Sequence, residues 1–289
     1  MTTAGPEAAA LPAPPIGLPG RLRIALRLQV LLLALLLAVP IHLFVHALAR
    51  RSSLPRHYLA FAARVIGARV EVRGTPLRRD VFFLCNHVSW LDIPALAGAT
   101  GTAFVAKAEV AEAPLIGWLA RLNRTVFVRR EARLDIAAQI NSLGAAMADA
   151  HAIAIFPEGT TTDGQSLLPF KTAMLKVLEP PPPGVMVQPV LLDYGALAPV
   201  LGWVGDESGL ANGLKVMGRK GTFPVRLHFL EPFSPEGLGG RKGIAAEARA
   251  RLETALLESL GQPLRPFAID VPAVRYTAPG AEAHDRAES

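Results

Sequence analysis

The sequence predicts an α/β fold in which a mixed, largely buried sheet is flanked by helices and preceded by an N-terminal membrane helix. Two observations lead to this prediction. From residue 81 onward, short apolar runs alternate with helical stretches, which is the pattern of an α/β sandwich. Before them, residues 28–49 contain no charged side chain. A chain of 289 residues has room for one large domain with appendages.

Composition divides the chain into four parts. Residues 1–20 are rich in Pro, Ala and Gly, so we expect a disordered leader. Residues 21–70 are predicted to hold a membrane anchor and an amphipathic helix. The main α/β domain is expected over residues 71–270, and a loose polar tail over residues 271–289.

The uncharged segment 28–49 is long enough to cross a hydrocarbon core of about 30 Å as a helix. Cleavage as a signal peptide is disfavoured, because the apolar stretch is too long and a Pro-rich leader precedes it. A spanning anchor and a helix that lies in or re-enters one leaflet both remain open, the latter favoured by Pro40, His42 and His46. Arginines flank both ends and give no decisive orientation: Arg21, Arg23, Arg27, Arg50, Arg51 and Arg56.

Residues 56–70 carry their apolar side chains on one broad side at helical spacing, so we predict an amphipathic helix there. Such a helix can pack on the domain core or lie at the membrane interface.

The elements after residue 80 follow from the alternation of apolar runs and helical patterns. The predicted strands are residues 81–85, 102–106, 125–128, 152–156, 185–192 and 225–230. The predicted helices are residues 89–99, 115–122, 133–150, 170–178 and 240–260.

Two polar segments at strand ends mark the candidate site. His87 follows the apolar run 81–85, and Asp92 lies five residues further on. In one continuous helix this spacing would separate the two side chains by about 140°. We therefore expect His87 outside the helix and Asp92 within its first turns. A histidine with an orienting carboxylate indicates general-base chemistry on a hydroxyl group.

The second segment, Phe156-Pro157-Glu158-Gly159-Thr160, leaves another apolar run. Its proline and glycine predict a tight turn with exposed backbone amides. The carboxylate of Glu158 could accept a hydrogen bond from a substrate hydroxyl or hold an arginine. Lys107, at a strand end, and Lys171, at a helix start, are further candidates for binding an anion.

Four sequence blocks together resemble the glycerolipid acyltransferases typified by 1-acylglycerol-3-phosphate acyltransferase. They span roughly residues 80–232. His87 and Asp92 match the His-x4-Asp motif, and residues 156–160 match the intact Phe-Pro-Glu-Gly-Thr block. Arg130 takes the arginine position after an apolar strand, and Pro189 lies in the fourth block.

The resemblance implies a membrane-bound O-acyltransferase that moves a fatty acyl group from a thioester to a lysolipid hydroxyl. His87 and Asp92 would be catalytic. Arg130, Glu158, Gly159, Thr160, Lys107 and Lys171 would bind substrate, and a guanidinium can grip phosphate or carboxylate through two parallel hydrogen bonds. The co-substrate would be acyl-CoA or acyl-carrier protein, with no further cofactor and no metal.

The acceptor lipid is the harder question. The first expectation is 1-acyl-sn-glycerol-3-phosphate, which would give phosphatidate. Thr161 stands where the phosphatidate-making branch usually has arginine, and residues 161–164, 168–171, 187–190 and 203–206 look like the branch that acylates lyso-ornithine lipid. That acceptor is the alternative, and a membrane lipid-binding protein without turnover is the non-enzyme alternative.

Charge and cysteine content agree with work at a membrane surface. The formal net charge of +6 suits anionic lipid headgroups, and the sequence has no dense basic stripe with interleaved aromatics for nucleic acid. The single cysteine, Cys85, can form no internal disulfide. We expect the inner (cytoplasmic) membrane, with the catalytic domain facing the cytoplasm. No Gly-x-Ser-x-Gly elbow, Walker A loop or dinucleotide fingerprint is present in the sequence.

Overall fold

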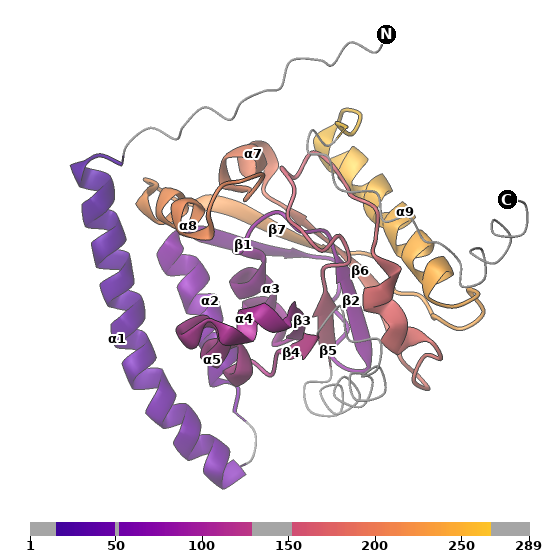
Figure 1. The fold of residues 1–289 in the computed structure, drawn as a ribbon, viewed down its shortest axis with the longest axis horizontal. Helices are drawn as coiled ribbons and strands as arrows, with labels where there is room; N and C mark the ends of the chain where they lie inside the picture. The colour runs from indigo at the N-terminus through magenta and orange to yellow at the C-terminus, as the bar shows by residue number, and fades with distance from the viewer. Residues whose placement is uncertain (1–15, 50–51, 129–151, 267–289) are drawn as a thin grey trace, which may run out of the picture.

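The computed structural model describes residues 16–49, 52–128 and 152–266. Within these ranges, seven strands form one sheet in the order β1-β7-β6-β2-β5-β3-β4 (Figure 1). The β6–β7 pair is antiparallel and the other pairs are parallel, so the predicted mixed sheet is confirmed. The strands are β1 (Ala68–Arg73), β2 (Val81–Cys85), β3 (Ala103–Lys107), β4 (Val126–Val128), β5 (Ala152–Ile155), β6 (Met186–Asp193) and β7 (Phe223–Phe229).

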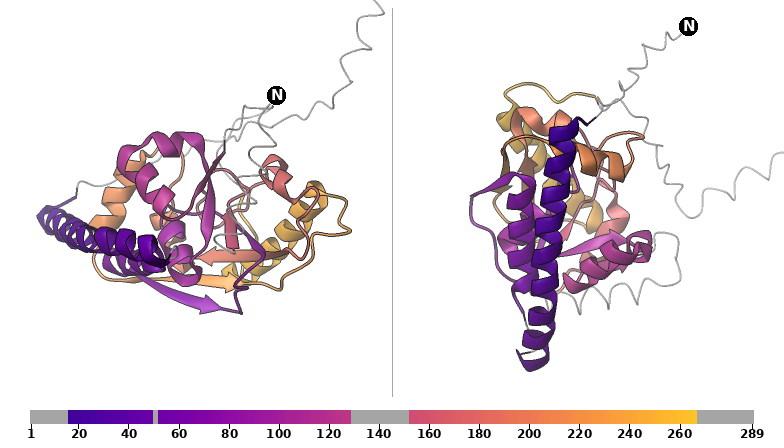
Figure 2. Two further views of the ribbon diagram at one scale, coloured as in Figure 1. Left: turned by 90° about the horizontal axis from the view of Figure 1, so that it is seen from below. Right: turned by 90° about the vertical axis from the view of Figure 1, so that its left-hand side faces the viewer.

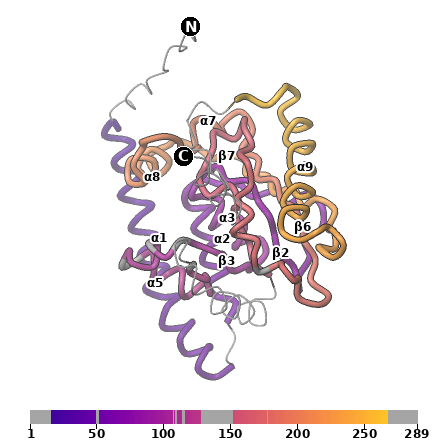
Figure 3. Tube along the Cα trace, turned by 45° about the vertical axis from the view of Figure 1, so that its right-hand side comes forward, coloured from indigo at the N-terminus to yellow at the C-terminus, as the bar shows by residue number. Residues whose placement is uncertain are grey.

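Helices cover both faces of the sheet. They are α1 (Leu18–Ala49), α2 (Leu54–Ile66), α3 (Asp92–Thr100), α4 (Ala108–Glu112), α5 (Pro114–Leu122), α7 (Ala198–Leu201), α8 (Gly209–Gly218) and α9 (Arg241–Leu260). Two short 3-10 helices, η1 (Thr172–Leu178) and η2 (Gly195–Leu197), complete the described elements. Figure 3 shows α9 beside β6, on the side of the molecule away from α1.

The central strand β2 is buried along its whole length because its side chains supply the cores on both faces. Phe83 and Cys85 point into the core that α2, α3 and α8 cover. Phe82 and Leu84 point into the core that η1 and α9 cover. Because both faces of β2 are buried, a strand at this place in the sheet has to be apolar along its whole length.

The helix predicted over residues 56–70 is too long at its C-terminal end. It ends at Ile66, because Gly67 adopts a left-handed conformation with φ of 113°. A Cβ at this position would lie 2.9 Å from the carbonyl oxygen of Gly221. The chain then continues as β1, an edge strand that pairs in parallel with β7 and that the apolar periodicity did not predict.

Other differences concern the boundaries of elements. The helix predicted over 89–99 begins at Asp92, and the one predicted over 170–178 is the 3-10 helix Thr172–Leu178. The helix predicted over 133–150 lies outside the described residues. The short helices α7 and α8 were not predicted.

Helix α1 lies along the domain instead of extending away from it (Figure 2). The Arg23 side chain donates to the carbonyl oxygen of Gly218 at 2.9 Å. Arg27 donates to the carbonyls of Met217 and Arg219 at 2.8 and 3.1 Å. These cations bind the carbonyl end of α8, where the helix dipole favours positive charge. A further contact lies one turn along α1 from Arg27, where the carbonyl of Leu31 accepts a hydrogen bond from the hydroxyl of Tyr58 in α2 at 3.3 Å.

Candidate active site

The carboxyl ends of β2, β5 and β6 bring three distant parts of the chain together. Because β2 is parallel to both β5 and β6, the residues that follow these strands lie just beyond the same edge of the sheet. They are Asn86 and His87 after β2, Phe156 after β5 and Tyr194 after β6. The Asn86 side chain fixes this junction. Its Oδ1 accepts from the Leu192 backbone N–H at 2.7 Å, and its Nδ2 donates to the Leu192 carbonyl at 3.1 Å. The turn after β2 is therefore locked against β6.

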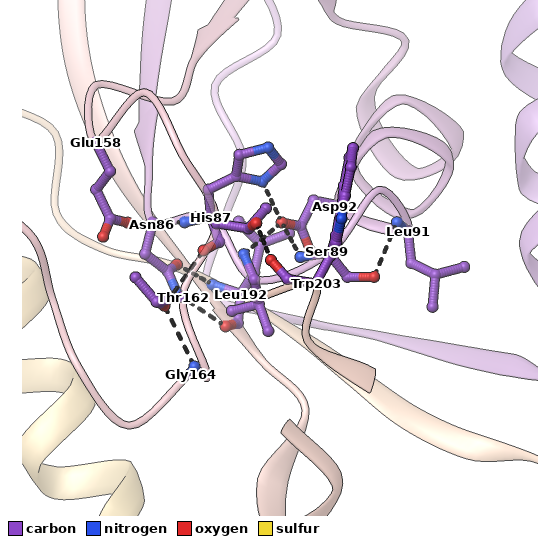
Figure 4. A network of polar contacts seen from close by, with 12 residues as sticks. Asn86, His87, Ser89, Leu91, Asp92, Glu158, Thr162, Gly164, Leu192 and Trp203 are labelled. Atoms are coloured by element: carbon purple, nitrogen blue, oxygen red, sulfur yellow. Dashed lines mark hydrogen bonds and ion pairs between the residues drawn. The ribbon is translucent and has the colours of Figure 1, made fainter. Parts of the chain in front are cut away.

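His87 and Asp92 form a close pair (Figure 4). His87 Nδ1 lies 2.6 Å from Asp92 Oδ2, and helix α3 begins at Asp92, as the spacing argument requires. The same carboxylate oxygen accepts the backbone N–H groups of Val88 and Ser89, at 2.8 and 3.0 Å. Because an ionised carboxylate only accepts, Nδ1 carries a proton and the lone pair resides on Nε2. This is the arrangement of a general base.

The imidazole ring of His87 is held in a fixed plane. It stacks on Phe156 with ring centroids 4.1 Å apart and an interplanar angle of 18°. Phe156 in turn stacks on Phe104. The His87 side chain is 20% exposed, whereas Asp92 is fully buried. One edge of the ring can thus meet a substrate while its orienting partner is shielded from water.

Glu158 is buried and binds backbone amides. Its Oε1 accepts from the His87 N–H at 2.8 Å, and its Oε2 accepts from the Leu168 N–H at 2.9 Å. Burial raises the pKa of this carboxyl to about 8, although the two amide hydrogen bonds lower it. Each oxygen thus binds one backbone amide, which gives Glu158 a positioning role, and its contact with a substrate hydroxyl stays a prediction.

The loop after Glu158 is attached to the histidine segment. The Thr162 backbone N–H donates to the His87 carbonyl at 2.8 Å, and the Trp203 N–H donates to the Val88 carbonyl at 3.0 Å. Thr161 is buried, and its hydroxyl donates to the carbonyl of Trp203. Gly159 takes a left-handed conformation with φ of 71°, which forms the expected tight turn, and Thr160 is exposed at its rim.

The structure brings together most of the residues that the sequence singled out. His87, Asp92, Glu158, Gly159 and Thr160 share one edge of the sheet. Lys171 joins them through its backbone, whose N–H donates to the Pro157 carbonyl at 2.8 Å. Lys107 ends β3. Arg130 lies outside the described residues.

One buried residue of the site escaped the sequence analysis. The Tyr194 hydroxyl donates to Asp92 Oδ1 at 2.5 Å. Tyr194 directly follows β6, so the rule that parallel strand ends share an edge could have placed it here. No motif pointed to it.

Comparisons with known proteins agree with this geometry. The family model described as Acyltransferase matches residues 69–193. The lyso-ornithine lipid O-acyltransferase of Rhizobium meliloti (strain 1021) is 33% identical over 273 residues, covering 89% of this chain and 93% of that protein. The 1-acyl-sn-glycerol-3-phosphate acyltransferase of Neisseria gonorrhoeae is 34% identical over 117 residues, covering 40% of this chain and 46% of that protein.

A solved structure shares the fold. The crystal structure of the 1-acyl-sn-glycerophosphate (LPA) acyltransferase PlsC from Thermotoga maritima superposes with a TM-score of 0.59 at 24% identity. The match covers 82% of this chain and 95% of that one.

Proposed function

The chain belongs to the acyltransferase family, and we propose that within it this enzyme is a lyso-ornithine lipid O-acyltransferase. It would move a fatty acyl group from acyl-CoA or acyl-carrier protein to the free hydroxyl of the lysolipid. The observation that carries the choice of acceptor is the extent of the likeness. The lyso-ornithine lipid enzyme matches over 89% of this chain, and the phosphatidate-type enzyme over 40%.

The geometry at Thr161 supports the same acceptor. The phosphatidate-making branch is expected to carry an arginine there, where it could meet a phosphate. In this chain the Thr161 side chain is buried and donates to the Trp203 carbonyl, so this position supplies no cation. An ornithine headgroup carries a carboxylate and an amine but no phosphate. The sequence alone put the phosphate acceptor first, and the fuller likeness reverses that order.

In the proposed reaction, the oxygen of the lysolipid hydroxyl attacks the carbonyl carbon of the thioester while His87 Nε2 takes the hydroxyl proton. Asp92 balances the positive charge that forms on the imidazole. The tetrahedral intermediate then collapses and the carbon–sulfur bond breaks. The leaving thiolate takes the proton back from His87, giving the ester and a free thiol.

A side-by-side assay tests the acceptor. The purified full chain is given a labelled acyl donor, as acyl-CoA and as acyl-carrier protein, with lyso-ornithine lipid or lysophosphatidate. We expect kcat/KM to favour lyso-ornithine lipid by about tenfold or more, the effect of one charge-assisted contact. A preference for lysophosphatidate would overturn the proposed acceptor, and His87→Ala protein supplies the blank.

We further propose that α1 holds the enzyme at the cytoplasmic membrane, with the catalytic domain facing the cytoplasm. Among the described residues, α1 is the helix long and apolar enough to cross a membrane, and none of its most apolar window is buried. Its contacts with α8 and α2 run along the domain surface. This supports the reading in which α1 lies in one leaflet, with its outward leucines in lipid.

Leu33→Asp combined with Leu37→Asp should release most of the protein from membranes. These side chains are 54% and 69% exposed, and an aspartate in the hydrocarbon region costs roughly 2.5–3.5 kcal/mol. Sedimentation after salt and carbonate washes measures the effect. Leu257→Asp, on the outer surface of α9 and 39% exposed in the wild type, is the matched control and should leave retention unchanged. Full retention of the double variant would exclude α1 as the principal anchor.

A further inference from the structure

Tyr194 is placed by the sheet at the far side of the catalytic carboxylate. It follows β6 directly and is 1% exposed. Its hydroxyl donates to Asp92 Oδ1, while Oδ2 accepts from His87 and from two backbone amides. The two oxygens of Asp92 therefore have separate tasks. One orients the histidine, and the other is bound to a phenol.

The phenol of Tyr194 keeps its proton at neutral pH and so stays a hydrogen-bond donor. Burial raises the pKa of Tyr194 well above its ordinary value, and the charge of Asp92 raises it further. A buried tyrosine hydroxyl needs a partner, and here that partner is the carboxylate that carries the negative charge of the site.

We propose that Tyr194 is a positioning residue for acyl transfer, which acts through Asp92 and sets how tightly His87 holds its proton. This inference rests on the proposed role of His87 as the base. The hydrogen bond from Tyr194 draws negative charge away from the side of the carboxylate that faces the imidazole. Without it, Asp92 attracts the imidazolium more strongly, and the base stays protonated up to a higher pH.

The titratable groups that face Asp92, apart from His87, are Cys85, Glu158 and Tyr194. Cys85 and Glu158 both interact with the charge of Asp92, and burial raises the pKa of each. The Glu158 carboxyl has a pKa of about 8, and Arg249 is the cation that acts on it. Burial thus raises the pKa values of Cys85, Glu158 and Tyr194 alike, which moves their titration away from the acid side of the profile.

The test is the pH dependence of kcat/KM for Tyr194→Phe in the full chain, with whichever lysolipid the wild type acylates. Phenylalanine keeps the ring and removes the hydroxyl. We expect the acid limb to move to higher pH by about one unit. The value of kcat/KM should then fall about tenfold at pH 6 and by less than about threefold on the plateau. Tyr58→Phe is the matched control, because its hydroxyl binds the Leu31 carbonyl away from the site, and its acid limb should stay in place.

A tyrosine analogue should shift the acid limb in the opposite direction, and this experiment does not depend on whether Tyr194→Phe folds. Incorporation of 3-fluorotyrosine in Tyr58→Phe/Tyr276→Phe protein, where Tyr194 is the remaining tyrosine, makes its phenol a stronger donor, so the acid limb should move to lower pH. An unchanged acid limb in both proteins would overturn the role of Tyr194.

An NMR titration of labelled His87 in detergent gives a readout that needs no turnover. His87 in Tyr194→Phe should deprotonate at a higher pH than in the wild type, and the same titration in both would contradict the proposal. If the wild type acylated neither lysolipid while this shift occurred, the proposed function would fail and the coupling through Asp92 would stand.

Discussion

Replacing His87 with alanine is expected to lower kcat about 10²–10⁴-fold, which is the usual loss when a general base is removed. The reason is the proposed role of Nε2, whose lone pair would take the hydroxyl proton while Nδ1 is held 2.6 Å from Asp92. Folding should survive, because the ring is partly exposed and Asp92 keeps its two backbone amides and Tyr194. Initial rates and the thermal midpoint, measured on the same preparation, separate catalysis from stability.

The matched control is His57→Ala. His57 is an exposed histidine of α2 whose Nδ1 lies 2.8 Å from the Ser53 carbonyl. It should retain wild-type rates. Turnover near the wild-type value in well-folded His87→Ala protein would exclude His87 as the base.

Asp92→Asn is expected to lose about 10²–10⁴-fold in kcat, comparable to the loss of the orienting aspartate in a Ser-His-Asp triad. The amide oxygen can take the place of Oδ2, which accepts from His87, Val88 and Ser89. The amide nitrogen then faces the Tyr194 hydroxyl, which can turn to accept. The geometry is kept, and what is lost is the negative charge that balances the imidazolium.

Asp206→Asn is the control, since Asp206 is exposed between α7 and α8. It should behave as wild type. Wild-type rates in Asp92→Asn would mean that His87 works without the carboxylate, and the paired mechanism would be wrong.

The sequence predicted the contact between His87 and Asp92 well, because local geometry decides it. The buried strand 81–85 is present with the expected bounds, and the turn angle of a helix required His87 to precede the helix and Asp92 to lie near its start. The alternating pattern likewise predicted the sheet, because strands buried on both faces are apolar throughout.

The rest of the site depends on long-range pairing, which no local pattern encodes. Tyr194 reaches Asp92 only because β6 lies beside β2. Glu158 was expected to face the substrate, yet its two oxygens bind amides of His87 and Leu168. The sequence did not predict strand β1, because apolar residues continue past Gly67 with a spacing that also fits a helix. The role of Arg130 stays a prediction.

The most direct test of the central claim is the double variant His87→Ala/Asp92→Asn, assayed beside both single variants. If Asp92 acts only through His87, the two residues form one unit and their effects are not additive. The double variant should then be about as slow as His87→Ala alone. A loss equal to the product of the two single losses would show that they act independently, and would contradict a base held and balanced by Asp92.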